Sequence, residues 1–195
     1  MKLRDKLVKS MADNNVIDTD EIDVYRFGVQ LLSETMISFL IFLIIAALFG
    51  SVTETIVFTA AFAALRQYAG GFHASEFIYC LLISCGIVGV FSIIVRFANL
   101  NLQYALALSA ISLPIILMLA PVDSKYKPIQ KTDETAYKRK LIILLVIEMI
   151  VAIITAFFSL HYVMCIVLSW CTLAMLMLAG HIQNKHDSSY NEKSI

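Results

Sequence analysis

Hydrophobic residues gather into long continuous stretches along the chain, and short polar segments separate them. A helix needs about 20 apolar residues to cross a hydrocarbon core of ~30 Å. Four stretches clearly approach that length, a fifth follows the fourth closely, and a sixth is short. In chain order they are 31–49, 52–65 (the short one), 77–95, 102–120, 141–160 and 162–179. The pattern predicts an all-α integral membrane protein with six transmembrane helices.

The distribution of basic residues tests the number of crossings. Lys and Arg collect in cytoplasmic loops, so they should gather in every second loop, on one side of the membrane, when the crossings are counted correctly. With six crossings, fourteen of the fifteen Lys and Arg residues share one side and only Arg96 lies opposite. Without stretch 52–65, the six basic residues between 125 and 140 lie opposite the basic N-terminus. We therefore expect six crossings of the cell membrane with both termini in the cytoplasm.

We expect one membrane domain over residues 1–195. Its parts are a cytoplasmic or interfacial helical region (1–26), a six-helix core (27–182) and a cytoplasmic tail (183–195). In the first region apolar residues recur at intervals near 3.6 among lysines, at Leu3, Leu7, Val8 and Met11. This spacing favours an amphipathic helix on the membrane surface, with an ordinary solvated helix as the alternative.

Composition agrees with the membrane assignment. The chain is 59% hydrophobic and 15% charged, with a mean hydropathy of +0.80, which is more apolar side chain than a soluble domain of this length can bury. Fifteen basic and fifteen acidic residues give zero net charge, so nucleic acid is not an expected partner. The four cysteines have no C-x-x-C spacing, and we expect reduced thiols, no metal and no cofactor.

The residues with chemical potential concentrate between 66 and 80. Gly70 and Gly71 permit backbone conformations that other residues resist, and irregular backbone at membrane depth must be buried in protein or face water. The sequence therefore predicts a Gly-Gly turn between the second and third crossings.

His73 and Cys80 are the candidate base and nucleophile in this segment. Seven residues place them on one helix face but about 10.5 Å apart, whereas proton transfer needs about 2.6–3.2 Å. The pair therefore requires His73 to lie on a turn that folds back over the helix carrying Cys80, and we expect Ser75 to cap that helix. The alternative is that Cys80 is a small apolar packing residue and His73 an interfacial polar one.

The stretch from Arg66 to Ala74, with Cys80 seven residues after His73, resembles the signature of the AgrB family (accessory gene regulator protein B). Ala-Pro-Val-Asp at 120–123, Lys-Pro-Ile at 127–129 and the six-crossing layout also resemble that family, so the resemblance covers nearly the whole chain. It implies a membrane cysteine endopeptidase that cleaves the C-terminal part of an AgrD-like propeptide in quorum sensing and virulence regulation.

On that resemblance Cys80 is the nucleophile and His73 the base. Attack of the thiolate on a peptide carbonyl gives an acyl-enzyme thioester and releases the C-terminal fragment. In the family a Cys or Ser of the peptide then displaces the enzyme thiol, which gives a cyclic thiolactone or lactone. A homodimer is implied by the resemblance only.

Supporting roles are expected for Arg66, Gln67, Gly70, Gly71 and Glu76. Arg66 can hold a carboxylate, the backbone of the turn or a lipid phosphate, and amides near the glycines can donate to the oxyanion. No third member of a triad is evident, although Gln67 and Glu76 lie near in sequence.

Two carboxyl groups lie within predicted crossings, Glu34 in the first and Glu148 in the fifth. Glu34 is a further candidate to approach the site, and we expect Glu148 to be protonated or hydrogen-bonded to another helix. The main alternative function is a small transporter or channel with a polar path through Arg66, Glu34 and Glu148. A non-catalytic scaffold is a second alternative. A transporter would tolerate Cys80→Ala but not substitution of Glu148.

Residues 125–140 form a basic segment. It is either a topology signal that contacts anionic lipids or a docking segment for an acidic propeptide tail.

Overall fold

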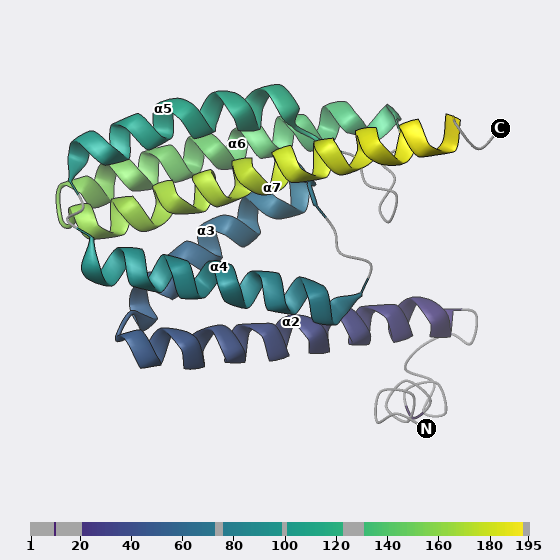
Figure 1. The fold of residues 1–195 in the computed structure, drawn as a ribbon, viewed down its shortest axis with the longest axis horizontal. Helices are drawn as coiled ribbons and strands as arrows, with labels where there is room; N and C mark the ends of the chain where they lie inside the picture. The colour runs from purple at the N-terminus through teal and green to yellow at the C-terminus, as the bar shows by residue number, and fades with distance from the viewer. Residues whose placement is uncertain (1–9, 11–20, 73–75, 99–100, 123–130, 193–195) are drawn as a thin grey trace. The chain divides into compact units, whose positions relative to one another are not determined.

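The computed structural model describes residue 10 and residues 21–72, 76–98, 101–122 and 131–192. These residues form helices and no sheet, as predicted (Figure 1). The helices are α2 (Ile22–Phe49), α3 (Val52–Ala69), α4 (Phe77–Phe97), α5 (Leu102–Leu119), α6 (Lys131–Ala156) and α7 (Leu160–Glu192). The amphipathic helix predicted near the N-terminus lies outside the described residues.

Several helices are longer than the apolar stretches that predicted them. Helix α6 begins at Lys131, before the predicted start at residue 141, and α7 continues to Glu192 across the boundary predicted at residue 182. The additional residues are mostly polar, and many are good helix formers such as Lys, Arg, Glu and Gln. An apolar stretch therefore predicts only the part of a helix that can lie in the hydrocarbon core. The helix continues into polar residues for as long as its backbone hydrogen bonds continue.

Four helices are long and apolar enough to cross a membrane by length and composition: α2, α4, α5 and residues 160–185 of α7. Helices α3 and α6 are long enough but do not meet the condition on apolar composition. Glu54 and Arg66 reduce the apolar character of α3. The last 18 residues of α6, its most apolar part, still include three charged residues, Arg139, Lys140 and Glu148. The structure thus supports an integral membrane protein with four such helices, and crossings by α3 and α6 stay predictions.

The chain divides into two compact units, residues 1–44 and 45–195. The first unit contains most of α2, where Gln30 Nε2 donates to Glu34 Oε1 at 2.8 Å. Glu34 therefore has a partner in its own helix, and its approach to Cys80 stays a prediction. The second unit contains α3 to α7 and every other candidate residue.

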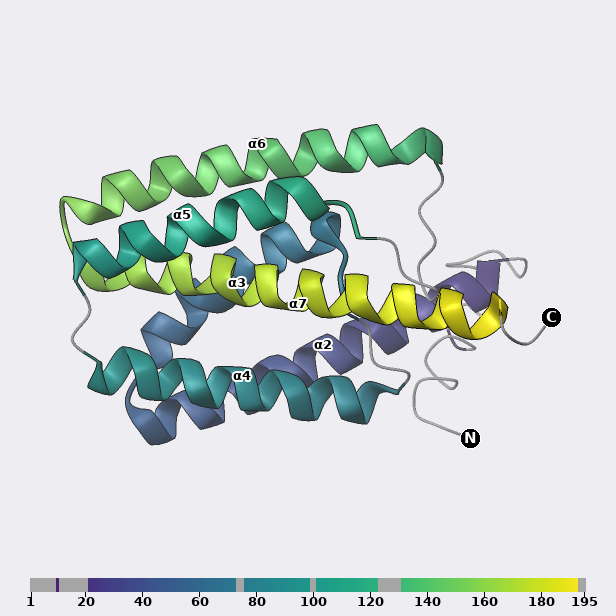
Figure 2. The same ribbon diagram turned by 45° about the horizontal axis from the view of Figure 1, so that its top comes forward.

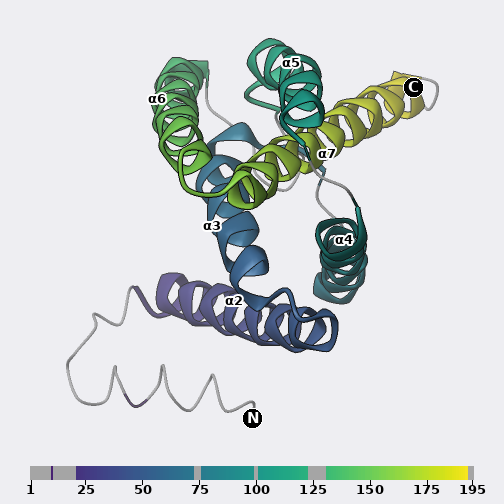
Figure 3. The ribbon, with the colours of Figure 1, turned by 90° about the vertical axis from the view of Figure 1, so that its left-hand side faces the viewer.

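Helix α7 is the central helix of the second unit and packs against α3, α4, α5 and α6. Burial covers 67% of its apolar span, compared with 22% for α4 and 17% for α5. In the end-on view of Figure 3, α7 begins close to α3, with α5 and α6 above it. Leu141 and Leu145 of α6 lie on one face and join the core that Met164, Leu173 and Met177 of α7 form.

Helices α3, α5 and α7 run in one direction and α4 and α6 in the other (Figures 1 and 2). Near the starts of α3 and α7, Glu54 Oε1 lies 3.1 Å from His161 Nε2. At the other end, Val122 N after α5 donates to Ala69 O at the end of α3. We call this second end, where α3 and α5 finish and α4 and α6 begin, the Gly70 end. Lys138 and Arg139 near the start of α6 also belong to it.

Candidate active site

The predicted Gly-Gly turn ends α3. Gly70 and Gly71 have φ values of 70° and 116°, a region that side-chain-bearing residues avoid. Gly70 N donates to Arg66 O at 3.3 Å, which closes the last turn of the helix. A Cβ atom on Gly70 would overlap the carbonyl oxygen of Val122, so glycine is needed here for space as well as for conformation. Gly71 is buried, which confirms that the turn faces protein.

Arg66 holds the backbone of this turn. Its guanidinium group donates to the carbonyl oxygens of Gly70 and Phe72. The planar guanidinium fork suits two acceptors at once. Among the three roles expected for Arg66, the structure therefore shows the one in which it binds the turn.

Arg66 also interacts electrostatically with Cys80. Arg66 lies in the last turn of α3, close enough to Cys80 for the two side chains to interact electrostatically. The positive charge of Arg66 thus lies within electrostatic reach of the candidate nucleophile.

The segment after α5 contacts the turn on one side. Val122 N donates to Ala69 O at 2.9 Å, and Val122 forms an isolated parallel bridge with Gly70. Val122 is buried. The sequence motif at 120–123 contained this residue, but nothing in the sequence indicated that it contacts the turn.

Helix α7 contacts the turn at a second place. Phe72 N donates to Leu176 O at 2.9 Å, and Gly180 lies one helical turn further along, directly against Gly71 and Phe72. Sequence analysis missed both α7 residues. The available signal was Gly180 itself, since an isolated glycine inside a long helix often marks a packing constraint.

Cys80 lies in the first turn of α4. The helix begins at Phe77 with Glu76 as its N-cap, and Cys80 N donates to Glu76 O at 3.3 Å. The cap predicted at Ser75 is therefore one residue too early, because Glu76 already has the extended backbone of a cap residue. Its carboxylate accepts no capping hydrogen bond. The correction places Cys80 closer to the helix N-terminus, where the positive end of the helix dipole acts.

The exposure of the thiols distinguishes Cys80 from the other cysteines. Of the four cysteines, all of which the structure describes, only Cys80 is exposed. Cys165 is buried, and its Sγ lies 3.3 Å from the carbonyl oxygen of His161. Cys171 and Cys85 are half-buried in α7 and α4. Cys85, Cys165 and Cys171 are therefore packing residues, whereas its accessibility favours Cys80 as the reactive thiol.

His73 falls outside the described residues, together with 74 and 75. The two residues that flank this segment, Phe72 and Glu76, both lie at the Gly70 end. The pairing of His73 with Cys80 stays a prediction.

The remaining polar candidates, Gln67 and Glu148, form hydrogen bonds within the protein. Gln67 is exposed, and its Nε2 donates to Ala64 O of its own helix at 3.1 Å. Glu148 is buried in α6, and Trp170 Nε1 of α7 donates to its Oε2 at 2.7 Å, which confirms the expected hydrogen bond to another helix. Among the residues with described positions, no three His, Cys, Asp or Glu side chains gather as a metal site would require.

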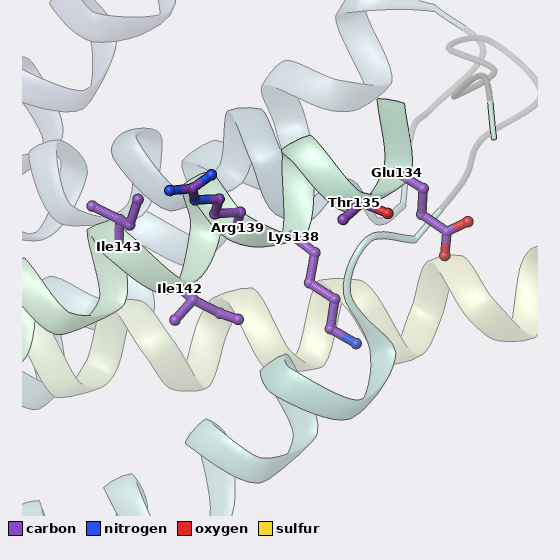
Figure 4. A pocket seen from close by; sticks show the side chains of 6 residues that line it. All are labelled: Glu134, Thr135, Lys138, Arg139, Ile142 and Ile143. Carbon is purple, nitrogen blue, oxygen red and sulfur yellow. The ribbon is translucent and has the colours of Figure 1, made fainter. Parts of the chain in front are cut away.

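A shallow depression of about 370 Å³ lies along α6 at the Gly70 end. Its lining side chains all project from α6 (Figure 4) and are Glu134, Thr135, Lys138, Arg139, Ile142 and Ile143. Nearby, Lys140 Nζ lies 5.7 Å from the centre of the Tyr68 ring of α3. Helix α6 therefore changes from charged to apolar residues where the basic segment ends, as expected at a membrane surface.

Comparisons with known proteins give a consistent result. The family model for accessory gene regulator B matches residues 4–178. Accessory gene regulator protein B of Staphylococcus aureus (strain MW2) is 25% identical over 174 residues, which cover 89% of this chain and 91% of that protein. Putative AgrB-like protein 2 of Clostridium perfringens (strain 13 / Type A) is 27% identical over 130 residues, 63% of this chain and 60% of that protein. Protein FsrB of Enterococcus faecalis (strain ATCC 47077 / OG1RF) is 26% identical over 137 residues, 66% of this chain and 57% of that protein. The matches thus span about three fifths of the latter two relatives, and no solved structure matches the chain.

Proposed function

The chain belongs to the accessory gene regulator B family, and from that premise we propose that it is a membrane cysteine endopeptidase that cleaves an AgrD-like propeptide. The observation that carries the proposal is the gathering of candidate groups at the Gly70 end. There the exposed Cys80 lies within electrostatic reach of Arg66, and Arg66 binds the turn that leads directly into His73.

In the proposed reaction His73 accepts the proton of the Cys80 thiol, and the sulfur attacks the carbonyl carbon of the scissile peptide bond. A C–S bond forms, and the C–N bond breaks when His73 returns the proton to the leaving amine. The C-terminal fragment departs, and the N-terminal portion of the propeptide stays on Cys80 as a thioester.

The tetrahedral intermediate requires donors for its oxyanion. The amide of Gly70 already donates to Arg66 O, whereas the amide of Gly71 has no backbone acceptor among the described residues. We assign the oxyanion contact to Gly71 N. The guanidinium charge of Arg66 adds electrostatic stabilisation to the negative charge that develops there.

The second step is an acyl transfer within the peptide. A Cys thiol or Ser hydroxyl of the bound portion attacks the thioester carbonyl, which releases the Cys80 thiol and closes a thiolactone or lactone ring. Water competes for the same thioester, so a site at the edge of an apolar bundle favours cyclisation over hydrolysis.

We further propose that the protein crosses the cell membrane six times and has both termini in the cytoplasm. Two observations support this topology. Helices α3 to α7 alternate in direction (Figure 1), and six crossings place fourteen of the fifteen Lys and Arg residues on one side of the membrane. Residues 1–26 would lie at the cytoplasmic surface, and lipid and the propeptide are the proposed partners. A homodimer rests on the family resemblance alone.

The transporter alternative gains no support from the contacts in the bundle. Arg66 binds two carbonyl oxygens, and Glu148 accepts a hydrogen bond from Trp170. Both side chains are therefore hydrogen-bonded within the protein, whereas a transport path needs polar side chains that face a water-filled pathway.

The test is intact-mass analysis of the protein in lipid nanodiscs mixed with the propeptide encoded beside it. Native protein should gain a mass equal to the N-terminal portion of the propeptide, and the C-terminal fragment should appear in solution. Cys80→Ala should show neither product, and His73→Ala should lose cleavage with unchanged membrane insertion. Cys85→Ala, in the same helix, is the matched control and should behave as native. Cleavage by folded Cys80→Ala would contradict the proposal.

A further inference from the structure

Helix α7 contacts the turn at Phe72, the last described residue before the gap at 73–75. Phe72, the residue directly before His73, donates its amide hydrogen to Leu176 O at 2.9 Å. A helix carbonyl has a second lone pair, so Leu176 O can accept this bond without leaving its own helix. The backbone position from which His73 begins is therefore fixed by α7.

Gly180 makes this contact possible. A methyl group in place of its hydrogen would stand 2.5 Å from Phe72 N, 2.6 Å from the carbonyl carbon of Gly71 and 2.9 Å from Gly71 Cα. All three atoms are backbone atoms, which cannot move aside as the end of a flexible side chain does.

The turn also has little freedom to retreat from α7. Arg66 binds the carbonyl oxygens of Gly70 and Phe72, and Val122 pairs with Gly70 on another side. Glycine is a poorer helix former than alanine, so its position in the central helix has no local explanation. The close approach of the turn supplies one.

We propose that Gly180 is a positioning residue for the peptidase reaction: its missing side chain lets the turn dock on α7 and thereby fixes the backbone of Gly71 and Phe72, from which the chain continues to His73. In this proposal Gly180 acts through the backbone of Gly71 and Phe72, and its effect on catalysis passes along the chain to His73. This inference rests on the proposed function, and the experiments below separate the failure of one from the failure of the other.

Gly180→Ala is the first variant. We expect kcat for propeptide cleavage to fall about 100-fold, because a displacement of about 1 Å in an active site can have that effect, whereas KM changes less than about threefold. Gly86→Ala and Gly89→Ala are matched controls, since both glycines lie in helix α4 with no atom within 4 Å of an added Cβ. Both controls should cleave at the native rate.

A double-mutant cycle tests whether Gly180 acts through His73. The readout is the rate at which iodoacetamide alkylates Cys80, mapped to its peptide by mass spectrometry. Gly180→Ala and His73→Ala should each slow alkylation, and the double variant should be no slower than His73→Ala alone. Additive effects, or a Gly180→Ala rate equal to that of Gly86→Ala, would overturn the positioning role. Unimpaired cleavage by His73→Ala would instead overturn the proposed function.

A second variant avoids any added atom in the helix. Replacing the Phe72 amide by an ester removes the hydrogen-bond donor to Leu176 O and keeps the side chain. We expect a lower kcat with an unchanged KM, while an ester at Ala98, whose amide donates to Ile94 O at 2.9 Å at the opposite end, should leave kcat unchanged. Equal behaviour of the two esters would overturn the inference even if Gly180→Ala failed to fold.

Discussion

Gly70→Ala is the substitution for which the structure predicts the clearest consequence. Gly70 has φ 70° and ψ −150°, a combination that is essentially restricted to glycine, and a Cβ atom there would overlap Val122 O. Gly50 is the matched control because its φ is also positive, 66°, but an added Cβ would meet no atom within 4 Å. The two variants separate backbone strain from the contact with Val122.

The expected magnitudes follow from these two effects. Backbone strain alone should lower the free energy of unfolding of Gly50→Ala by about 1–2 kcal/mol. Gly70→Ala carries backbone strain of about 1–3 kcal/mol and an overpacking cost of about 1–3 kcal/mol, so about 2–6 kcal/mol in total. The protein can relieve this by moving the turn away from Val122. If moving the turn away lowers the free energy of the variant by about 2 kcal/mol, the population in which the turn is docked against Val122 falls about 30-fold.

The assays are unfolding by denaturing detergent and cleavage of a labelled propeptide in nanodiscs. Gly70→Ala should lose cleavage at least about 30-fold, whereas Gly50→Ala should cleave at close to the native rate despite its lower stability. The reasoning fails if Gly70→Ala matches Gly50→Ala in both assays, because the contact with Val122 would then not constrain the turn.

Two further substitutions test separate contacts. Arg66→Lys should reduce cleavage by about 10- to 100-fold, because one ammonium group cannot reproduce the fork that binds two carbonyl oxygens; full activity in the propeptide assay would show that the fork is not needed. Trp170→Phe should lower the free energy of unfolding by about 1–3 kcal/mol, because it leaves the buried Glu148 carboxyl without its donor. Its cleavage rate should stay within about threefold of native, and a selective loss of activity with unchanged stability would favour a functional role for Glu148.

Most of the membrane character and the position of the turn could be predicted from the sequence. Long apolar stretches predicted helices at the places of α2 to α7, because the requirement for internal hydrogen bonds in lipid acts on each stretch separately. Gly70 and Gly71 predicted the turn for an equally local reason, the absence of a Cβ atom. The predicted start of α6 and the predicted end of α7 were wrong, because hydropathy follows the membrane rather than the helix.

The sequence also singled out Arg66 and Cys80, but it left three roles open for Arg66 and gave no means of choosing. The tertiary structure decided that Arg66 binds the turn, that Cys80 is the exposed thiol, and that Leu176 and Gly180 support the turn from α7. The contacts of the turn with Leu176 and Gly180 join residues about a hundred positions apart, so they depend on how the helices pack. Periodicity and propensity describe a residue and its near neighbours, whereas the partners of the turn exist only once α7 lies in the centre of the bundle.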